Sequence, residues 1–281
     1  MDVYEQLRQT TRERVSDGAI APILAGCDGA QQLLVLVWPQ LGDFDSLEYA
    51  WWLHRERDKL QAAGIVVRAV GIGDRAAGQR FAEFTGFPAA ALFVDPTATL
   101  HRELGLYAGL TRHWPGLKPQ QDAWINLMIM CAGIASPGTL REVVRGYTGD
   151  RAAPQLIADE EVISGTPLPP LKGAFFATAG GKGFQRPFEL ATLRLRNMTE
   201  VLSHWGTYVP DARYMTQRGG TFLWDREGKL LYEHRDRGIL GFAANMSNPL
   251  GFLWDAAAAT TNPQPSTAAP GAASPASRST G

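Results

Sequence analysis

Cysteine is scarce in this chain of 281 residues, which contains only Cys27 and Cys131. Two cysteines so far apart in sequence exclude a disulfide scaffold and any CxxC motif. The five histidines are scattered without the paired spacing of metal ligands, so we expect no metal site. Each cysteine is most simply a small buried apolar side chain.

The chain also lacks an excess of charge of either sign, because 27 basic side chains balance 28 acidic ones. Nucleic-acid binding needs a basic stripe, whereas basic and acidic residues alternate here, as in residues 54–57. No run of about 18 apolar residues could span a membrane, and residues 1–16 lack the apolar segment of a secretory signal. We therefore expect a cytosolic protein that binds no nucleic acid and spans no membrane.

Strand-like and helix-like segments alternate in the first half of the chain. Strands are predicted at residues 33–38, 65–72 and 89–94, and helices at residues 47–63 and 74–85. The first strand is an unbroken apolar run ended by Pro39, and Gly86 closes the second helix. Parallel strands with right-handed helical crossovers explain this order, so the pattern predicts an α/β fold.

The flanking segments carry weaker patterns. Residues 1–18 predict an amphipathic helix, residues 165–183 predict a long Pro/Gly-rich loop, and further helices are expected at 121–135, 139–146 and 188–204. A β-hairpin is expected from the segments 221–224 and 229–233 around a short Gly-containing turn. We thus expect an N-terminal helix and lead-in at 1–32, one domain at 33–255 with an insertion at about 111–211, and a disordered tail at 256–281.

The order and spacing of these elements resemble the peroxiredoxin-like AhpC/TSA proteins. The similarity extends over residues 33–110 and 214–235, and includes a late Arg-Gly followed by strand, Asp-x-x-Gly turn and strand. It implies a thioredoxin-like, peroxiredoxin-type sheet flanked by helices, with no cofactor. In that family, the peroxidatic cysteine opens a helix within a Pro-x-x-x-Thr/Ser-x-x-Cys pattern, and a late arginine faces it.

Laid on that pattern, this chain keeps Pro39, has Asp43 in place of the threonine and Ser46 in place of the cysteine, and matches the late arginine with Arg218. Another branch of the family carries a CxxC at this turn, and there Asp43 and Ser46 replace both cysteines. Both alignments imply a site without a thiol. Peroxide reduction needs a thiolate whose acidity is enhanced by a helix N-terminus and a nearby cation, which a serine hydroxyl cannot replace.

Structural roles compete with chemical ones at these positions. Ser46 could act as a nucleophile only with an activating base, yet the chain has no Gly-x-Ser-x-Gly elbow and no histidine near Ser46 in sequence. Asp43 is best interpreted as a helix cap. Arg218 either belongs to an anion-stabilising site or pairs with Asp43 across the turn, and we favour the pairing.

Two glycine-rich segments are superficially similar to nucleotide-binding loops. Residues 71–78 lack the third glycine of a dinucleotide fingerprint in its place, and residues 180–183 lack the leading glycine and the Ser/Thr of a phosphate loop. Both are better interpreted as turns.

Three hypotheses for function follow. The first is a peroxiredoxin-like protein without the thiol site that binds a protein partner in redox-linked regulation or assembly; the adjacent Trp51 and Trp52 could belong to such a surface. The second is an atypical thiol peroxidase or oxidoreductase that uses Cys27 or Cys131, although an apolar helix around Cys131 would raise its pKa. The third is a small-molecule enzyme with residues 165–183 as a lid, for which no nucleophile can be named.

Overall fold

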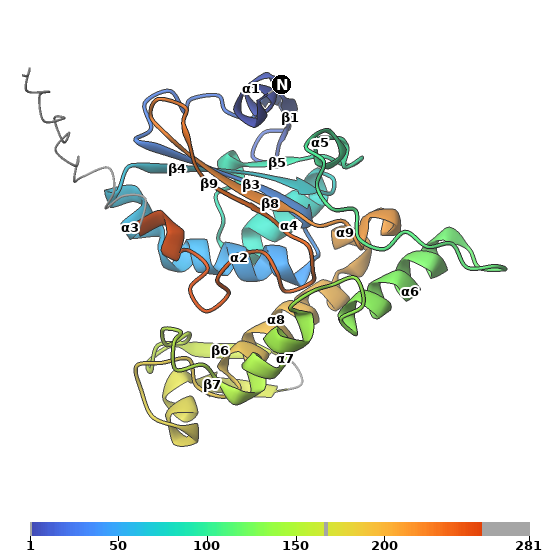
Figure 1. Ribbon diagram of the computed structural model, residues 1–281. Helices are drawn as coiled ribbons and strands as arrows, with labels where there is room; N and C mark the ends of the chain where they lie inside the picture. The colour runs from blue at the N-terminus through green and yellow to red at the C-terminus, as the bar shows by residue number, and fades with distance from the viewer. Residues whose placement is uncertain (1, 166–167, 255–281) are drawn as a thin grey trace, which may run out of the picture.

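A seven-stranded sheet forms the centre of the computed structural model, which describes residues 2–165 and 168–254 (Figure 1). Its strand order is β2-β1-β5-β4-β3-β8-β9. The strands are β1 (Thr11–Arg14), β2 (Ile20–Pro22), β3 (Gln32–Gln40), β4 (Ile65–Ile72), β5 (Leu92–Val94), β8 (Gly220–Asp225) and β9 (Leu230–Arg235). β3, β4 and β5 are parallel, whereas β8 and β9 run antiparallel beside β3. The α/β, thioredoxin-like fold and the late hairpin are thereby confirmed.

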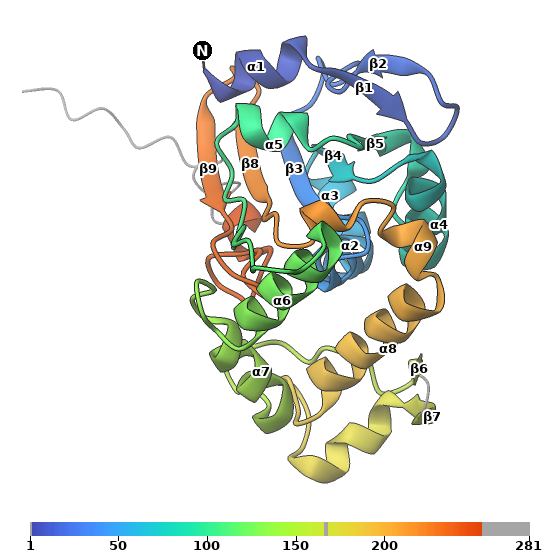
Figure 2. The same ribbon diagram turned by 90° about the vertical axis from the view of Figure 1, so that its right-hand side faces the viewer.

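Helices cover both faces of this sheet (Figures 1 and 2). α2 (Phe44–Arg55), α3 (Arg57–Ala62) and α4 (Arg75–Thr85) lie on one face, and α1 (Val3–Gln9) and α5 (Thr99–Glu103) on the other. All nine residues of β3 are buried, as its unbroken apolar run predicts. Their side chains alternate between two cores: Leu34, Leu36 and Trp38 pack with α2 and α4, and Leu33, Val35 and Val37 pack with α1 and α5.

Local signals fixed several elements. β4 has the predicted bounds, and α4 begins after Asp74, whose carboxylate accepts a hydrogen bond from the backbone N–H of Ala77 at 2.9 Å. Gly86 ends α4 with φ +72°, a left-handed conformation that favours glycine. The helix predicted at residues 47–63 is interrupted at Glu56, which separates α2 from α3.

Two predicted elements near the sheet edge are wrong in part. The N-terminal helix ends at Gln9, and Thr11–Arg14 forms β1 instead, because its backbone pairs with both β5 and β2. The third strand begins only at Leu92, since Ala89–Ala91 form a 3-10 turn after Pro88. Alanine has little preference for strands, so the apolar run 89–94 overstated the strand length.

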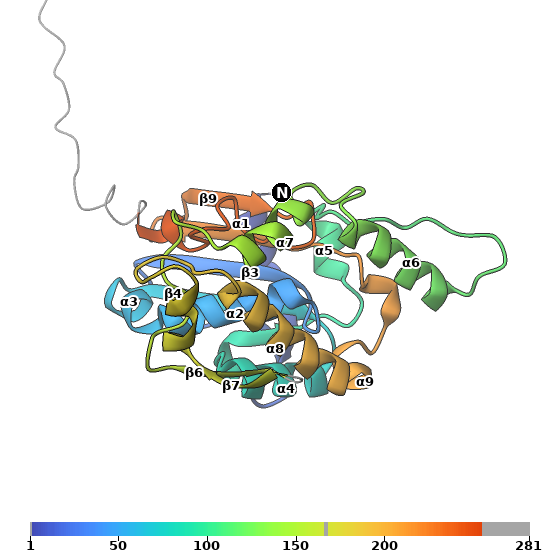
Figure 3. The same ribbon diagram turned by 90° about the horizontal axis from the view of Figure 1, so that it is seen from below.

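The segment expected to be an insertion forms a second layer beneath α2 and α4. It contains α6 (Pro119–Cys131), α7 (Thr139–Thr148), β6 (Val162–Gly165), β7 (Leu168–Lys172), the 3-10 helix η2 (Gly173–Ala179), α8 (Glu189–Ser203) and α9 (Trp205–Tyr208). α8 lies between α7 and the β6–β7 hairpin (Figures 2 and 3). Ion pairs attach α8 to the first layer: Arg194 to Glu48 of α2 at 2.8 Å, and Glu200 to Arg80 of α4 at 2.6 Å.

The long loop predicted at residues 165–183 is also wrong, because most of it forms β7 and η2. Two prolines stand within β7, and the register with β6 shifts between Ile163 and Gly165. A two-stranded ribbon tolerates prolines because each strand has an unpaired edge. The predicted disordered tail at 256–281 lies outside the described residues. No helix within the described residues is long and apolar enough to cross a membrane.

Candidate functional site

The turn between β3 and α2 places the residues that the family pattern singled out. β3 ends at Gln40, and α2 begins after Asp43, whose carboxylate accepts a hydrogen bond from the backbone N–H of Asp45 at 2.9 Å. Asp43 is therefore the N-cap of α2, as predicted. A cap of this kind is worth roughly 0.5–2 kcal/mol.

A close approach of two strands brings Arg218 to this turn. A Cβ atom at Gly219 would lie 2.3 Å from the carbonyl oxygen of Val37 and 2.9 Å from Cδ of Pro39. Only glycine permits β8 to begin so near the end of β3. The backbone N–H of Arg218 donates to the carbonyl of Tyr107 at 2.8 Å, which fixes its position.

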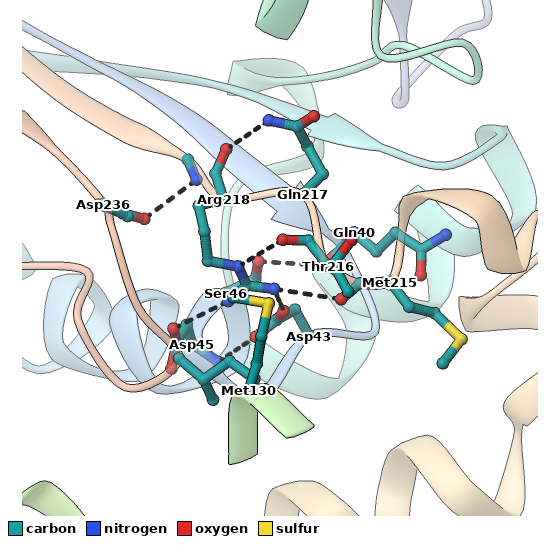
Figure 4. A network of polar contacts seen from close by, with 12 residues as sticks. Gln40, Asp43, Asp45, Ser46, Met130, Met215, Thr216, Gln217, Arg218 and Asp236 are labelled. Carbon is teal, nitrogen blue, oxygen red and sulfur yellow. Dashed lines mark hydrogen bonds and ion pairs between the residues drawn. The ribbon is translucent and has the colours of Figure 1, made fainter. Parts of the chain in front are cut away.

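The Arg218 guanidinium is fully buried and bound by groups of the chain itself (Figure 4). Nη2 contacts the Asp43 carboxylate and the carbonyl of Met215. Nη1 contacts the Asp45 carboxylate at 3.3 Å, and Nε donates to the carbonyl of Thr216 at 3.1 Å. The predicted ion pair between Arg218 and Asp43 is present, and all three guanidinium nitrogens have internal acceptors.

A third acid, Asp236, completes what we call the Arg218 cluster: Arg218, Asp43, Asp45 and Asp236. Asp236 is buried and accepts a hydrogen bond from the backbone N–H of Gly219 at 3.2 Å. Its other carboxylate oxygen has no hydrogen-bond partner among the described residues and lies 3.5 Å from Nε2 of His234. Three carboxyl groups thus act on one guanidinium: Asp43 and Asp45 contact it, and Asp236 acts on it through its charge.

This imbalance shifts the titration of the acids. Burial raises the pKa of Asp236 to about 7, although Arg218 opposes the shift. Burial and the neighbouring Asp43 raise the pKa of Asp45 well above its ordinary value, again against Arg218. Burial alone would lower the pKa of Arg218, but Asp43 and Asp45 hold it above its ordinary value. The cluster therefore keeps a charged arginine, and Asp45 and Asp236 retain their protons to higher pH than exposed aspartates do.

Ser46 lies in the first turn of α2 and is fully buried. Its hydroxyl donates to the carbonyl of Gln40 at 3.0 Å, so its proton is directed at the backbone. That hydrogen bond ties the start of α2 to the end of β3. The structure brings Pro39, Asp43, Ser46 and Arg218 to one turn, where the pattern predicts them.

The second layer and the loop after β9 close this turn from solvent. The fully buried Met130 of α6 reaches toward the guanidinium (Figure 4). The backbone N–H of Leu240 donates to both oxygens of Asp45 at 2.9 Å. Leu240 has φ +58°, a left-handed conformation that is costly for a residue other than glycine. The Asp45 carboxylate thus holds a strained loop over the cluster.

Sequence reasoning missed Asp45, Asp236 and Leu240. Asp45 and Leu240 are 195 residues apart, and nothing in their spacing indicates contact. One signal was available in the sequence. Asp45 is an acidic residue at the start of a helix that follows a buried strand, and such a helix must pack against the core. Within the described residues, no three His, Cys, Asp or Glu side chains are placed to hold a metal ion.

The two cysteines lie in different environments. Cys131 ends α6 and is exposed, yet packing around its thiol raises the pKa, Asp43 and Asp45 raise it further, and Arg218 lowers it. Cys131 directly follows Met130, the residue of α6 that reaches toward the Arg218 guanidinium (Figure 4). Cys27 is buried in the core on the α1 side of the sheet, and burial raises its pKa too. Cys27 therefore lies on the face of the sheet opposite to α2.

The sheet order and the helix that starts after β3 define a thioredoxin-like protein. Residues 52–238 match the family described as AhpC/TSA antioxidant enzyme, and the chain belongs to this family. The matched segment begins at Trp52, so the turn at residues 39–46 lies before it. Among curated proteins, a sequence search finds none that is significantly similar.

Proposed function

We propose that this member of the AhpC/TSA family performs no thiol chemistry at the turn after β3. It acts instead by binding a protein partner in the cytoplasm, in redox-linked regulation or assembly. The observation that carries this proposal is the closed Arg218 cluster, in which Asp43, Asp45 and two carbonyl groups occupy the guanidinium.

The charges at the turn after β3 are unsuited to peroxide chemistry. A reactive thiolate or a bound peroxide needs a cation with free N–H groups beside a helix N-terminus. In this chain Arg218 is neutralised by internal carboxylates, and the Asp43 cap takes the place of an anion at the start of α2. Ser46, tied to the carbonyl of Gln40, has no base among its hydrogen-bond partners.

A second candidate is a thiol peroxidase or oxidoreductase that uses Cys131. One observation favours it: the Cys131 thiol is exposed and lies within the electrostatic reach of Arg218. Burial and the nearby acids oppose it, because together they raise the pKa of this thiol and reduce its thiolate fraction. Cys27 is the weaker of the two alternative thiols, since it lies buried in the opposite core.

Stopped-flow consumption of hydrogen peroxide and of an alkyl hydroperoxide, with a thioredoxin system as reductant, tests the proposal. We expect the wild type to consume peroxide no faster than a Cys27→Ser, Cys131→Ser double variant. Turnover in the wild type that disappears in Cys131→Ser but persists in Cys27→Ser would overturn the proposal and establish Cys131 as the reactive thiol.

A further inference from the structure

Helix α7 has its polar side inside and its apolar side outside. Its buried side carries Glu142, which is 2% exposed, and Arg145, which contacts Glu142 at 2.7 Å and the Gln185 side chain at 2.6 Å. Its outer side carries four large apolar residues that are each 39–58% exposed: Leu140, Val143, Val144 and Tyr147. A surface helix normally shows the reverse arrangement. We call these four residues the α7 ridge.

An apolar groove borders the α7 ridge. It has a volume of about 580 Å³ and runs between α7 and α8, with Val143 and Tyr147 in its wall. Phe44 and Leu240 line it beside the Arg218 cluster, and Phe175 and Phe188 also contribute their rings. Val143 and Tyr147 belong to both the ridge and the wall of the groove, so ridge and groove form one continuous apolar surface. Figures 2 and 3 show α7 and α8 side by side in the second layer.

The exposed apolar area of the α7 ridge and its neighbours lies at the upper end of what a monomer shows. With Phe175 and Phe188, the α7 ridge exposes roughly 600 Å², because one aromatic side chain alone covers about 150–250 Å². The largest apolar patch of a monomer is usually about 300–600 Å². A stable interface buries about 800 Å² on each partner, so the ridge and its surroundings supply most of what a dimer needs.

We propose that the α7 ridge is the interface through which two copies of this chain associate, with the two α7 helices antiparallel. The ridge is suited to pairing with itself because its side chains follow one another along the helix as large, small, small and large: Leu140, Val143, Val144 and Tyr147. About a two-fold axis between Val143 and Val144, Leu140 of one copy meets Tyr147 of the other. The small valines at the centre let the helices approach closely, so that each ridge enters the groove of the other copy.

Charge favours a second copy over a charged partner. The chain has a net charge of −1, so two copies repel each other little. The four ridge positions carry no charge, and Arg141 is the flanking cation on the outer side of α7. Another copy presents the same uncharged ridge, which matches these features. The interface is independent of the proposed function, because it uses none of the residues of the Arg218 cluster.

Sedimentation velocity of the full chain tests this interface with charge variants. At about 50 μM, where interfaces of this size are populated, we expect the wild type to sediment at twice its 30.6 kDa mass. Val144→Glu and Val144→Lys should each sediment as monomers, because like charges meet near the two-fold axis. An equimolar mixture of the two should recover the dimer, since opposite charges then face each other.

Ile20→Glu is the matched control, because Ile20 is equally apolar and 71% exposed, but lies on β2 at the far edge of the sheet. It should remain dimeric, and circular dichroism should show native folding in all variants. A wild type that stays monomeric at this concentration overturns the proposal. This holds also if the monomer binds a soluble apolar dye in its groove. The proposal is also overturned by a dimer that survives Val144→Glu, or by a mixture that stays monomeric.

Discussion

The Arg218 cluster and the α7 ridge differ in how their groups are satisfied. In the cluster, charged side chains are buried, and the guanidinium of Arg218 finds acceptors within the chain. On the ridge, apolar side chains such as Val144 are exposed, because the rest of the chain covers them only in part. The guanidinium of the first region is bound within the isolated chain, whereas the apolar side chains of the second region would be covered by the second copy that we propose.

This difference separates two uses of the same fold. A site that is to bind an external anion must leave donors free, whereas acceptors of this chain already bind all three guanidinium nitrogens of Arg218 with four hydrogen bonds. A surface that is to bind a protein must leave apolar area free, as the α7 ridge does. These contacts support the proposed function, in which the turn performs no peroxide chemistry.

The largest expected effect comes from removing the buried cation. Arg218→Met should lower the free energy of unfolding by about 3–5 kcal/mol, because it leaves buried carboxylates without their counter-charge. Val144→Ser, on the ridge, should change it by less than about 0.5 kcal/mol in dilute solution. Urea unfolding measures both, and a loss below about 1 kcal/mol for Arg218→Met would show that the cluster is not a buried ion-pair network.

A smaller effect should appear as a dependence on pH. The pKa of Asp236 is raised from 3.8 to about 7 in the folded chain, so folding favours its protonated form. The stability from this group is fully present below about pH 4 and is lost as the pH rises toward 7, at up to about 1.4 kcal/mol per pH unit. Asp236→Asn should therefore gain stability relative to the wild type across this window.

The comparison with the variant is needed because His101 acts in the opposite direction. Burial lowers the pKa of His101 to about 4, so its contribution is present above about pH 6.5 and is lost on acidification. Urea unfolding gives the free energy of unfolding of both proteins at each pH. Subtracting the wild-type value from the Asp236→Asn value removes the contribution of His101, which both proteins share. A difference that stays constant between pH 4 and 7 would contradict the raised pKa of Asp236.

The sequence predicted those parts of the structure whose causes are local. β4 and α4 follow from an apolar run, an Asp74 cap and the closing Gly86, and Asp43 was predicted as a cap for the same reason. The pairing of Arg218 with Asp43 came from the family pattern. β1 could not be predicted as a strand, because only its pairing with β5 and β2 makes it one.

The remaining parts of the site depend on distant segments. Asp45 receives the N–H of Leu240 across 195 residues, and Met130 covers the turn from a helix that the resemblance left outside its two matched stretches. The outward apolar side of α7 was also hidden, because periodicity reveals an amphipathic helix without showing which side packs on the protein.

The most direct test of the account is the acidity of a thiol placed at position 46. In a Cys27→Ser, Cys131→Ser background, Ser46→Cys should have a thiol pKa above about 8.5, because the site is buried and Asp43 lies beside it. Adding Asp43→Thr should lower that pKa, since it frees one side of Arg218. The pH dependence of alkylation measures both values. A thiol pKa below about 7 in Ser46→Cys alone would contradict the claim that this chain's own carboxylates neutralise Arg218.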